Sequence, residues 1–198
     1  MELVLIRHAR PHHIDGADGP ADPPLTDIGH RQALAMADWF GAEPVDALYV
    51  SPLARARQTV APLERLLGRE ATVIDGVREF DADGSSYVPI EVLRRDKVAW
   101  RAYLAEEAAL DRAGFAREVT ATLEEVVVSH RGQRVAVVCH GGVINVWASH
   151  LLGLEPRLFF NPDYTSINRF LGASSGERSI VSLNETAHLR ADPDLRLS

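Results

Sequence analysis

Short apolar runs alternate along this chain with longer stretches whose apolar residues recur every three or four positions. The runs are too short for helices and predict buried strands of a parallel or mixed sheet. They lie at 3–6, 45–50, 71–74 and 134–139. The clearest helical pattern covers 115–130, where Val119, Leu123 and Val126 share one apolar stripe. Strands that alternate with helices in this way predict an α/β fold.

Local signals predict where several further elements begin and end. Thr26 suits the N-cap of a first helix, while Ser51 and Pro52 suit the cap and first position of a second. The polar tail 188–198 is expected to be poorly ordered or to lie along the surface. A hairpin is predicted from two apolar segments joined by a glycine-rich turn, 164–171 and 178–183.

The pattern weakens between the third strand and the long helix. We interpret residues 80–114 as a partly helical insertion that caps one side of a site, within a single domain covering 1–198. The insertion carries Tyr87, Trp100 and Tyr103. These aromatic residues either line a substrate pocket or pack the insertion's own small core.

Composition narrows the class of partner. The net charge of −7 argues against nucleic acid or an anionic membrane surface as the main partner. The single cysteine, Cys139, excludes an internal disulfide framework and a cysteine-rich zinc site. The chain has no signal-peptide pattern and no apolar stretch as long as a membrane span, so a soluble, cytoplasmic protein is expected.

One loop raises the question of a metal. His12 and His13 lie near aspartates in a stretch rich in proline and glycine. Their spacing matches no specific ligand pattern, so a solvated loop over the mouth of a pocket is the preferred interpretation. We therefore expect neither a metal nor another cofactor.

Chemistry-bearing residues follow several of the predicted strands. In parallel strands the carboxyl ends share one crevice, which is where open α/β sheets bind ligands. The residues that follow strand ends are Arg7, His8, Arg55, Glu79 and His140. Two guanidiniums and two imidazoles around one point describe a site for a phosphoryl group.

Neighbouring residues allow alternatives that the pattern disfavours. Arg57 is two positions from Arg55 and should face another way on a helix, so we expect at most one of them to reach the pocket. Cys139 could be a nucleophile, but strand alternation turns it away from the side of His140 and into the core. Gly141 exposes a backbone N–H at the start of the next helix, where anions bind.

Four motifs, in order and at familiar spacing, give the chain a family resemblance. They are Leu3-Val-Leu-Ile-Arg-His-Ala9, Pro24-Leu-Thr-Asp-Ile-Gly29, Ser51-Pro-Leu-Ala-Arg-Ala-Arg-Gln-Thr59 and His140-Gly-Gly142. Together they resemble the histidine phosphatase superfamily, also called the phosphoglycerate-mutase-like family. The resemblance implies a three-layer α/β/α sandwich with a mainly parallel central sheet and the site at its strand ends.

The resemblance also implies roles for individual residues. His8 matches the nucleophile that becomes a phosphohistidine, and Glu79 matches the proton donor. The clamp on the phosphoryl oxygens matches Arg7, Arg55 and His140, with Gly141 beside them as a substrate-binding position. The implied activity is metal-independent hydrolysis of a small phosphorylated metabolite.

Departures from the family pattern bear on the reaction. Ala9 stands where the family usually has glycine, and the residues after Glu79 do not match those of mutases and sugar bisphosphatases. A phosphatase is therefore favoured over a cofactor-dependent phosphoglycerate mutase. A non-catalytic protein that binds phospholigands is a third reading. The oligomeric state stays open, with a homodimer as one option.

Overall fold

The computed structural model describes residues 1–93, 95–98, 100–101 and 112–196. Its strands are β1 (Glu2–Arg7), β2 (Ala47–Val50), β3 (Thr72–Val73), β4 (Arg134–Cys139), β5 (Ile167–Gly172) and β6 (Arg178–Glu185). Its α-helices are α1 (Asp27–Phe40), α2 (Ala54–Leu67), α3 (Ile90–Leu93), α5 (Arg112–Ser129) and α6 (Gly141–Leu151). Short 3₁₀ helices are η1 (Asp75–Val77), η2 (Ala187–Leu189) and η3 (Pro193–Arg196).

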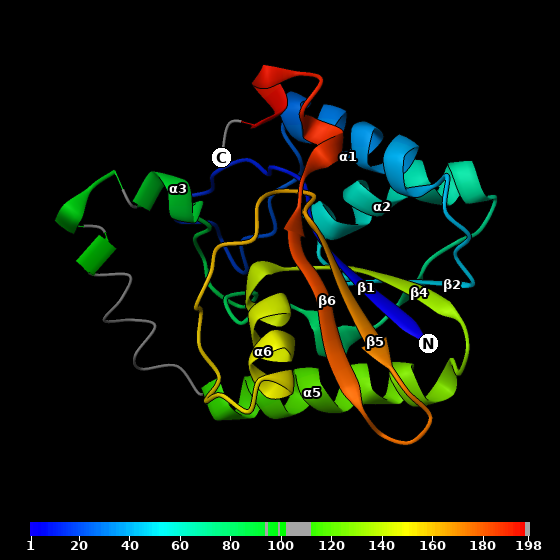
Figure 1. Ribbon diagram of the computed structural model, residues 1–198. Helices are drawn as coiled ribbons and strands as arrows, with labels where there is room; N and C mark the ends of the chain where they lie inside the picture. The colour runs from blue at the N-terminus through cyan, green and yellow to red at the C-terminus, as the bar shows by residue number, and fades with distance from the viewer. Residues whose placement is uncertain (94, 99, 102–111, 197–198) are drawn as a thin grey trace.

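The six strands form one sheet in the order β3-β2-β4-β1-β5-β6. The pairs β1/β4, β2/β4 and β2/β3 are parallel, whereas β5 pairs antiparallel with both β1 and β6. The predicted α/β fold, the mainly parallel sheet and the C-terminal hairpin are thus confirmed. Figure 1 shows α1 and α2 on one side of the sheet, with α5 and α6 on the other.

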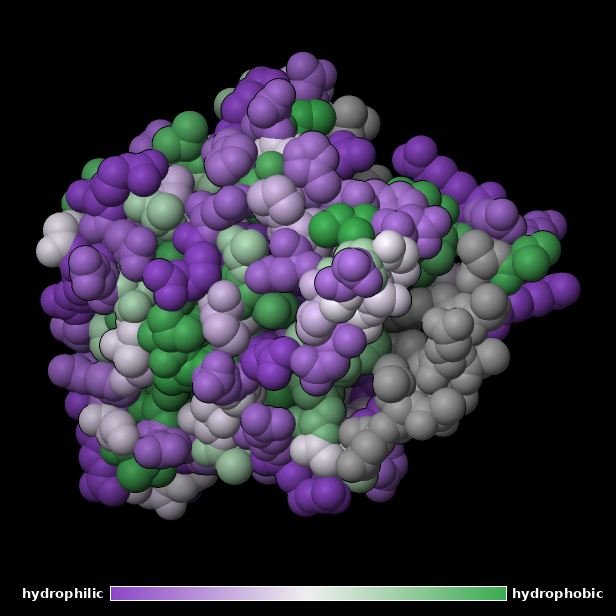
Figure 2. Space-filling view, turned by 180° about the vertical axis from the view of Figure 1, so that it is seen from behind, coloured by the Kyte–Doolittle hydropathy of each residue, from purple (hydrophilic) through white to green (hydrophobic). Residues whose placement is uncertain are grey.

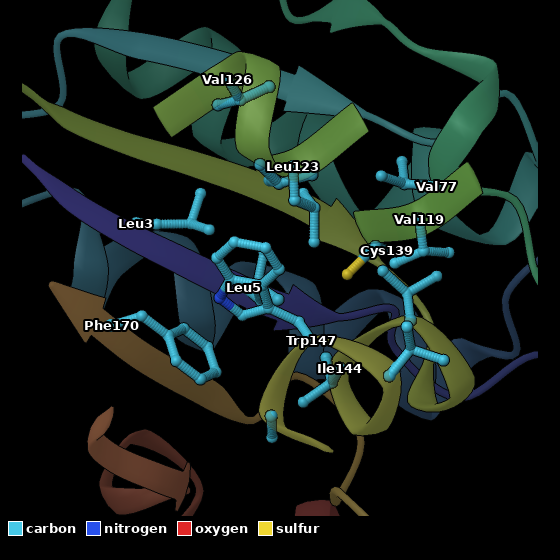
Figure 3. Close-up of a cluster of buried hydrophobic side chains, with 14 of the residues drawn as sticks. Leu3, Leu5, Val77, Val119, Leu123, Val126, Cys139, Ile144, Trp147 and Phe170 are labelled. Carbon is cyan, nitrogen blue, oxygen red and sulfur yellow. The ribbon is translucent and has the colours of Figure 1, made fainter. Parts of the chain in front are cut away.

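The side chains of β1 point alternately to the two faces of the sheet, and each face is covered by a layer of helices. Leu3 and Leu5 pack with the α5 and α6 side chains, whereas Val4 and Ile6 pack with those of α1 and α2. Both faces of the central strands are therefore buried, which is why they read as continuous apolar runs. Figure 3 shows the first cluster, in which Cys139 lies among apolar side chains. The expectation that this cysteine belongs to the core is confirmed.

Three local predictions meet different outcomes. Thr26 caps α1 as predicted, because its side chain accepts a hydrogen bond from the Gly29 backbone N–H. The predicted cap at Ser51 is wrong: α2 begins at Ala54 with Leu53 as its N-cap. The third strand is shorter than predicted, since only Thr72–Val73 pair with β2.

The C-terminal tail packs against the body of the protein. Leu189 and Leu195 are buried, and the Gln32 side chain of α1 donates a hydrogen bond to the Leu195 carbonyl. Arg31 also forms an ion pair with Asp192. Of the two alternatives predicted for this segment, poor order or packing along the surface, the structure supports the second. The tail lies on α1, as the red segment of Figure 1 shows.

The face of the molecule seen in Figure 2 is mainly hydrophilic. On the face shown in Figure 2, apolar side chains stand in small groups among polar ones. Within the described residues, every helix falls short of the length and apolarity needed to cross a lipid bilayer. Part of the predicted insertion, including Tyr103, lies outside the described residues.

Candidate active site

Parallel pairing brings the first and fourth strands to a common end. Arg7 is the register partner of Cys139, and the His8 N–H donates to the Cys139 carbonyl at 2.9 Å. The next strand along, β2, leads to Ser51, whose N–H donates to the Val138 carbonyl at 3.0 Å. His8, His140 and Ser51 therefore leave three adjacent strands side by side.

His8 is held as a neutral base with a defined tautomer. Its ring is buried, and Nδ1 lies 2.8 Å from the Ala9 carbonyl oxygen. Because a carbonyl only accepts, Nδ1 carries the proton and Nε2 keeps its lone pair. Burial, reinforced by the charges of Arg55 and Arg7, lowers the pKa of His8 well below its usual value. The ring is thus ready for nucleophilic attack at neutral pH.

The residue after His8 shows why alanine is accepted there. Ala9 is buried and packs with Leu25 and Ala33 in a small apolar cluster. Its N–H donates to the Thr59 hydroxyl at 2.8 Å, and that hydroxyl donates to the Arg55 carbonyl at 2.6 Å. The methyl group fills a gap, while the backbone keeps its link to α2.

Arg55 is a buried cation poised for an anion. Its side chain is 1% exposed, and none of its three nitrogens has a hydrogen-bond partner in the described part of the chain. Asp22 and Asp81 balance its charge from 3.7 and 3.6 Å. The guanidinium also lies over the Tyr87 ring, 4.6 Å from its centroid. Buried donors normally find partners, so this group suits an incoming anion.

Arg7 approaches from the other side and is oriented by the loop before β5. Its Nη1 donates to the Pro162 carbonyl at 2.5 Å, and its guanidinium lies 4.2 Å from the centroid of the Tyr164 ring. Asn145 of α6 holds this loop by accepting hydrogen bonds from the Phe159 and Phe160 N–H groups. Arg57, in contrast, is exposed on α2, as the two-residue spacing predicts.

His140 is oriented by Ser51, whose side chain contacts this histidine and does not cap α2 as its sequence predicts. Its Nε2 lies 2.7 Å from the Ser51 Oγ, and its ring centroid is 5.1 Å from that of His8. Burial lowers the pKa of His140 well below its usual value, helped by the charges of Arg55 and Arg7. The remaining nitrogen, Nδ1, is buried without a partner among the described residues.

Glu79 lies beside the start of α6. The Gly142 N–H donates to its Oε2 at 2.9 Å and the Phe80 N–H to its Oε1 at 3.2 Å. Burial, together with the charge of Asp81, raises the pKa of Glu79 to about 7. A carboxyl group with this pKa can both donate and accept a proton near neutral pH. A Cβ on Gly142 would lie 2.1 Å from Oε1, so only glycine permits this arrangement.

Most of these groups line one cavity of about 220 Å³, whereas His140 is fully buried behind His8 and is not part of the lining. Its lining contains the predicted residues Arg7, His8, Arg55, Glu79 and Gly141. Tyr87 and Trp100 also line it, which favours the pocket alternative for these two aromatic residues. A larger cavity of about 490 Å³ adjoins it and shares Glu79, Phe80, Gly142 and Leu158 as lining.

Several site residues gave no usable signal in the sequence. The sequence gives no sign of the contacts made by Asp81, Asp22 and Tyr164, because their partners, Arg55 and Arg7, are distant along the chain. The sequence around Ser51 predicts a helix cap instead of a contact with His140. Gly142 could have been singled out from the glycine pair that follows His140, but its contact with Glu79 needs the fold. His12 and His13 are exposed, and in the described residues no three histidine, cysteine, aspartate or glutamate side chains gather as a metal site requires.

Known proteins that are similar to this chain include phosphatases and a probable mutase that act on phosphate esters, according to their names. A putative phosphoserine phosphatase from Hydrogenobacter thermophilus is 28% identical, over 95% of this chain and 97% of its own. A probable phosphoglycerate mutase from Yersinia enterocolitica is 26% identical, over 79% of this chain and 77% of its own. A solved phosphoserine phosphatase from Entamoeba histolytica, in complex with 3-phosphoglyceric acid, superposes with a TM-score of 0.75. It is 25% identical and covers 95% of this chain and 98% of its own.

The family model described as histidine phosphatase superfamily (branch 1) matches residues 3–186. This range contains every residue of the candidate site. The match agrees with the resemblance expected from the sequence motifs and with the observed fold. The protein therefore belongs to branch 1 of the histidine phosphatase superfamily.

Proposed function

We propose that this protein hydrolyses phosphate monoesters of small metabolites through a phosphohistidine at His8. The observation that carries the proposal is the pairing of a neutral, tautomer-fixed imidazole with a buried guanidinium, Arg55, that has no hydrogen-bond partner in the described structure. A nucleophile and an anion-binding cation therefore line one cavity. Membership of a phosphatase family and similarity to a phosphatase-named relative support the same activity.

In the first step, His8 Nε2 attacks phosphorus and the bond from phosphorus to the ester oxygen breaks. The oxygen leaves with a proton from Glu79, which becomes a carboxylate. Arg7 and Arg55 balance the charge on the phosphoryl oxygens, where phosphoryl transfer gains most of its catalysis. The His140 ring and the N–H of Gly141, at the start of α6, are further donors for these oxygens.

In the second step, the Glu79 carboxylate takes a proton from water, and the water oxygen attacks phosphorus. The bond between phosphorus and His8 Nε2 breaks, inorganic phosphate is released, and both side chains return to their starting states. A pKa of about 7 lets Glu79 serve in both directions without a large cost in either. No metal is required by these steps.

Phosphoglycerate mutase is a second candidate, favoured by similarity to the Yersinia protein named as a probable mutase. A mutase must hold the phosphohistidine until it returns the phosphoryl group to substrate. The sequence after Glu79 differs from that of mutases, so we rank this candidate lower. Incubating 3-phosphoglycerate with a bisphosphate primer distinguishes isomerisation from hydrolysis.

The test is phosphate release in the presence of EDTA from a panel of phosphate monoesters, with His8→Ala as the blank. The panel includes p-nitrophenyl phosphate, sugar phosphates, nucleotides, phosphoamino acids and 3-phosphoglycerate. We expect turnover that EDTA leaves intact and that His8→Ala abolishes. Turnover that survives His8→Ala would contradict the proposal, as would tight phosphate binding by a protein that hydrolyses none of these esters.

A further inference from the structure

The catalytic cavity is unusually poor in cations beyond those that the phosphoryl group needs. Among the described residues that line it, Arg7 and Arg55 are the only guanidinium or ammonium groups. Both are assigned to the phosphoryl oxygens in the proposed reaction. A carboxylate or second phosphate on the leaving group would therefore find no cation in this lining. Arg78, Arg112 and Arg157 line the larger neighbouring cavity instead.

Asp81 gives the same cavity a second carboxyl group beside Glu79; burial raises the pKa of Asp81, and the charge of Arg55 opposes that rise. Its Oδ1 is buried, accepts no hydrogen bond in the described structure and lies 3.6 Å from Arg55 Nη2. The side chain as a whole is 37% exposed and lines the cavity. When a phosphoryl dianion engages Arg55, the charge that balances Asp81 is shared with the new anion. Asp81 then has reason to pair with a cation from the substrate itself.

The remaining wall suits a cation as well. Tyr87, Trp100, Phe159 and Phe160 all line the cavity, and the last two rings have their centroids 5.0 Å apart. Aromatic rings attract ammonium groups through their negative faces, and a carboxylate within an aromatic wall is a usual way to recognise such groups. Among the described residues of the lining, Asn145 and Asn161 are the only polar side chains besides the groups already named, and both are neutral.

We propose that the leaving group carries an ammonium ion that binds Asp81 and the aromatic wall, so that the preferred substrates are phosphate monoesters of amino alcohols. This inference rests on the proposed phosphatase function and narrows its substrate class. It also predicts that an added carboxylate lowers preference, so phosphoethanolamine should be a better substrate than phosphoserine. In this respect the chain would differ from its phosphoserine phosphatase relatives.

The experiment compares esters that differ only in charge. Phosphoethanolamine is paired with n-propyl phosphate, in which a methyl group replaces the ammonium, and phosphocholine with 3,3-dimethylbutyl phosphate. The ratio of kcat/KM within each pair removes effects common to all esters. The ammonium also makes its alcohol a better leaving group, and comparing the ratio between the wild type and Asp81→Asn removes that contribution. We expect a ratio of about 10 or more for at least one pair, equivalent to about 1.4 kcal/mol. Asp81→Asn should bring it to within about twofold of 1.

Asp83→Asn is the matched control. This aspartate is two residues further on, its side chain is 85% exposed, it pairs with Arg78 and it does not line the catalytic cavity. The control should keep the wild-type ratio. A wild-type ratio near or below 1 for both pairs would overturn the inference. A ratio that Asp81→Asn leaves unchanged, or a preference for phosphoserine over phosphoethanolamine, would do the same.

A binding measurement separates this inference from the proposed reaction. Calorimetry on the His8→Ala protein gives the dissociation constants of the same ester pairs without turnover. If the wild-type protein hydrolyses no ester, including p-nitrophenyl phosphate, the proposed function fails. The ratio of dissociation constants then still decides whether the cavity selects an ammonium group: about 10 supports the inference, and about 1 refutes it.

Discussion

Adding one methyl group at Gly142 should disable the acid proposed at Glu79 while leaving the nucleophile proposed at His8 in place. In Gly142→Ala the new Cβ would lie 2.1 Å from Glu79 Oε1, against an ordinary contact of about 3.4 Å or more. The carboxyl group must therefore move by about 1 Å and give up its 2.9 Å hydrogen bond from the residue 142 N–H. His8 should keep its bond to the Ala9 carbonyl, because the three atoms nearest to the new methyl group belong to Glu79 and Phe80.

The size of the effect depends on the leaving group. General acid catalysis contributes about 10² to 10⁴ in rate, and a misplacement of about 1 Å can cost about 100-fold. We therefore expect kcat/KM for alkyl phosphates to fall about 100-fold, or about 2.7 kcal/mol. The loss for p-nitrophenyl phosphate should be less than about tenfold, because its leaving group departs without a proton.

Gly141→Ala controls for an extra methyl group in the same turn. Its Cβ would meet nothing closer than 3.9 Å, so it displaces neither Glu79 nor Arg7. Any loss in this variant should fall equally on alkyl and p-nitrophenyl esters, since the Gly141 N–H is proposed to donate to the phosphoryl oxygens that both ester types share. Steady-state kinetics on the two substrate types, with circular dichroism to verify folding, measures both variants. Equal losses on the two substrates in Gly142→Ala would refute the assignment of Glu79 as the acid.

Three further predictions concern pH, the serine and the tail. Because Glu79 must be protonated to act as the acid, turnover of alkyl esters at saturating substrate should fall as pH rises through about 7. The loss of activity caused by protonation of His8 should lie well below pH 6.5. A rise in turnover from pH 7 to 8 would contradict this prediction. Ser51→Ala removes the hydrogen bond that orients His140 and should lower kcat/KM about tenfold for all esters alike. Stopped assays that show no loss would mean that Ser51 has no role in the site. Burial lowers the pKa of His188 to about 4, so the unfolded chain binds a proton at higher pH than the folded chain does. The free energy of unfolding should therefore fall as pH drops from about 6.5 towards 4, by up to about 3 kcal/mol. Chemical denaturation of His188→Asn should show a smaller pH dependence, and an identical one would exclude His188 as the source.

Much of the site could be predicted because the ends of buried strands can be recognised in the sequence. A buried parallel strand reads as a continuous apolar run, and the residues after it must lie at the sheet edge. Arg7, His8 and His140 are brought together by this rule alone, through the pairing of β1 with β4. The motif resemblance then chose Arg55 over Arg57, a choice that the helical spacing left open.

The remaining parts depend on contacts that local patterns do not encode. Ser51 followed by proline is typical of a helix cap, yet the helix begins later and the hydroxyl contacts His140 instead. Asp81 lies in a loop and Arg55 on a helix, and the number of residues between them follows no pattern that predicts their contact. The tail is polar on average, and two buried leucines were enough to place it on α1. Each of these outcomes was decided by tertiary packing.

The central claim is that His8 carries the phosphoryl group during turnover. Its most direct test is a rapid quench of the protein with a phosphate monoester in alkali, followed by mass spectrometry of the peptide that contains residue 8. We expect a single added phosphoryl group on His8 that is stable in alkali, lost in acid and absent from His8→Ala. Steady hydrolysis with no modification of His8, or with the phosphoryl group on another residue, would contradict it.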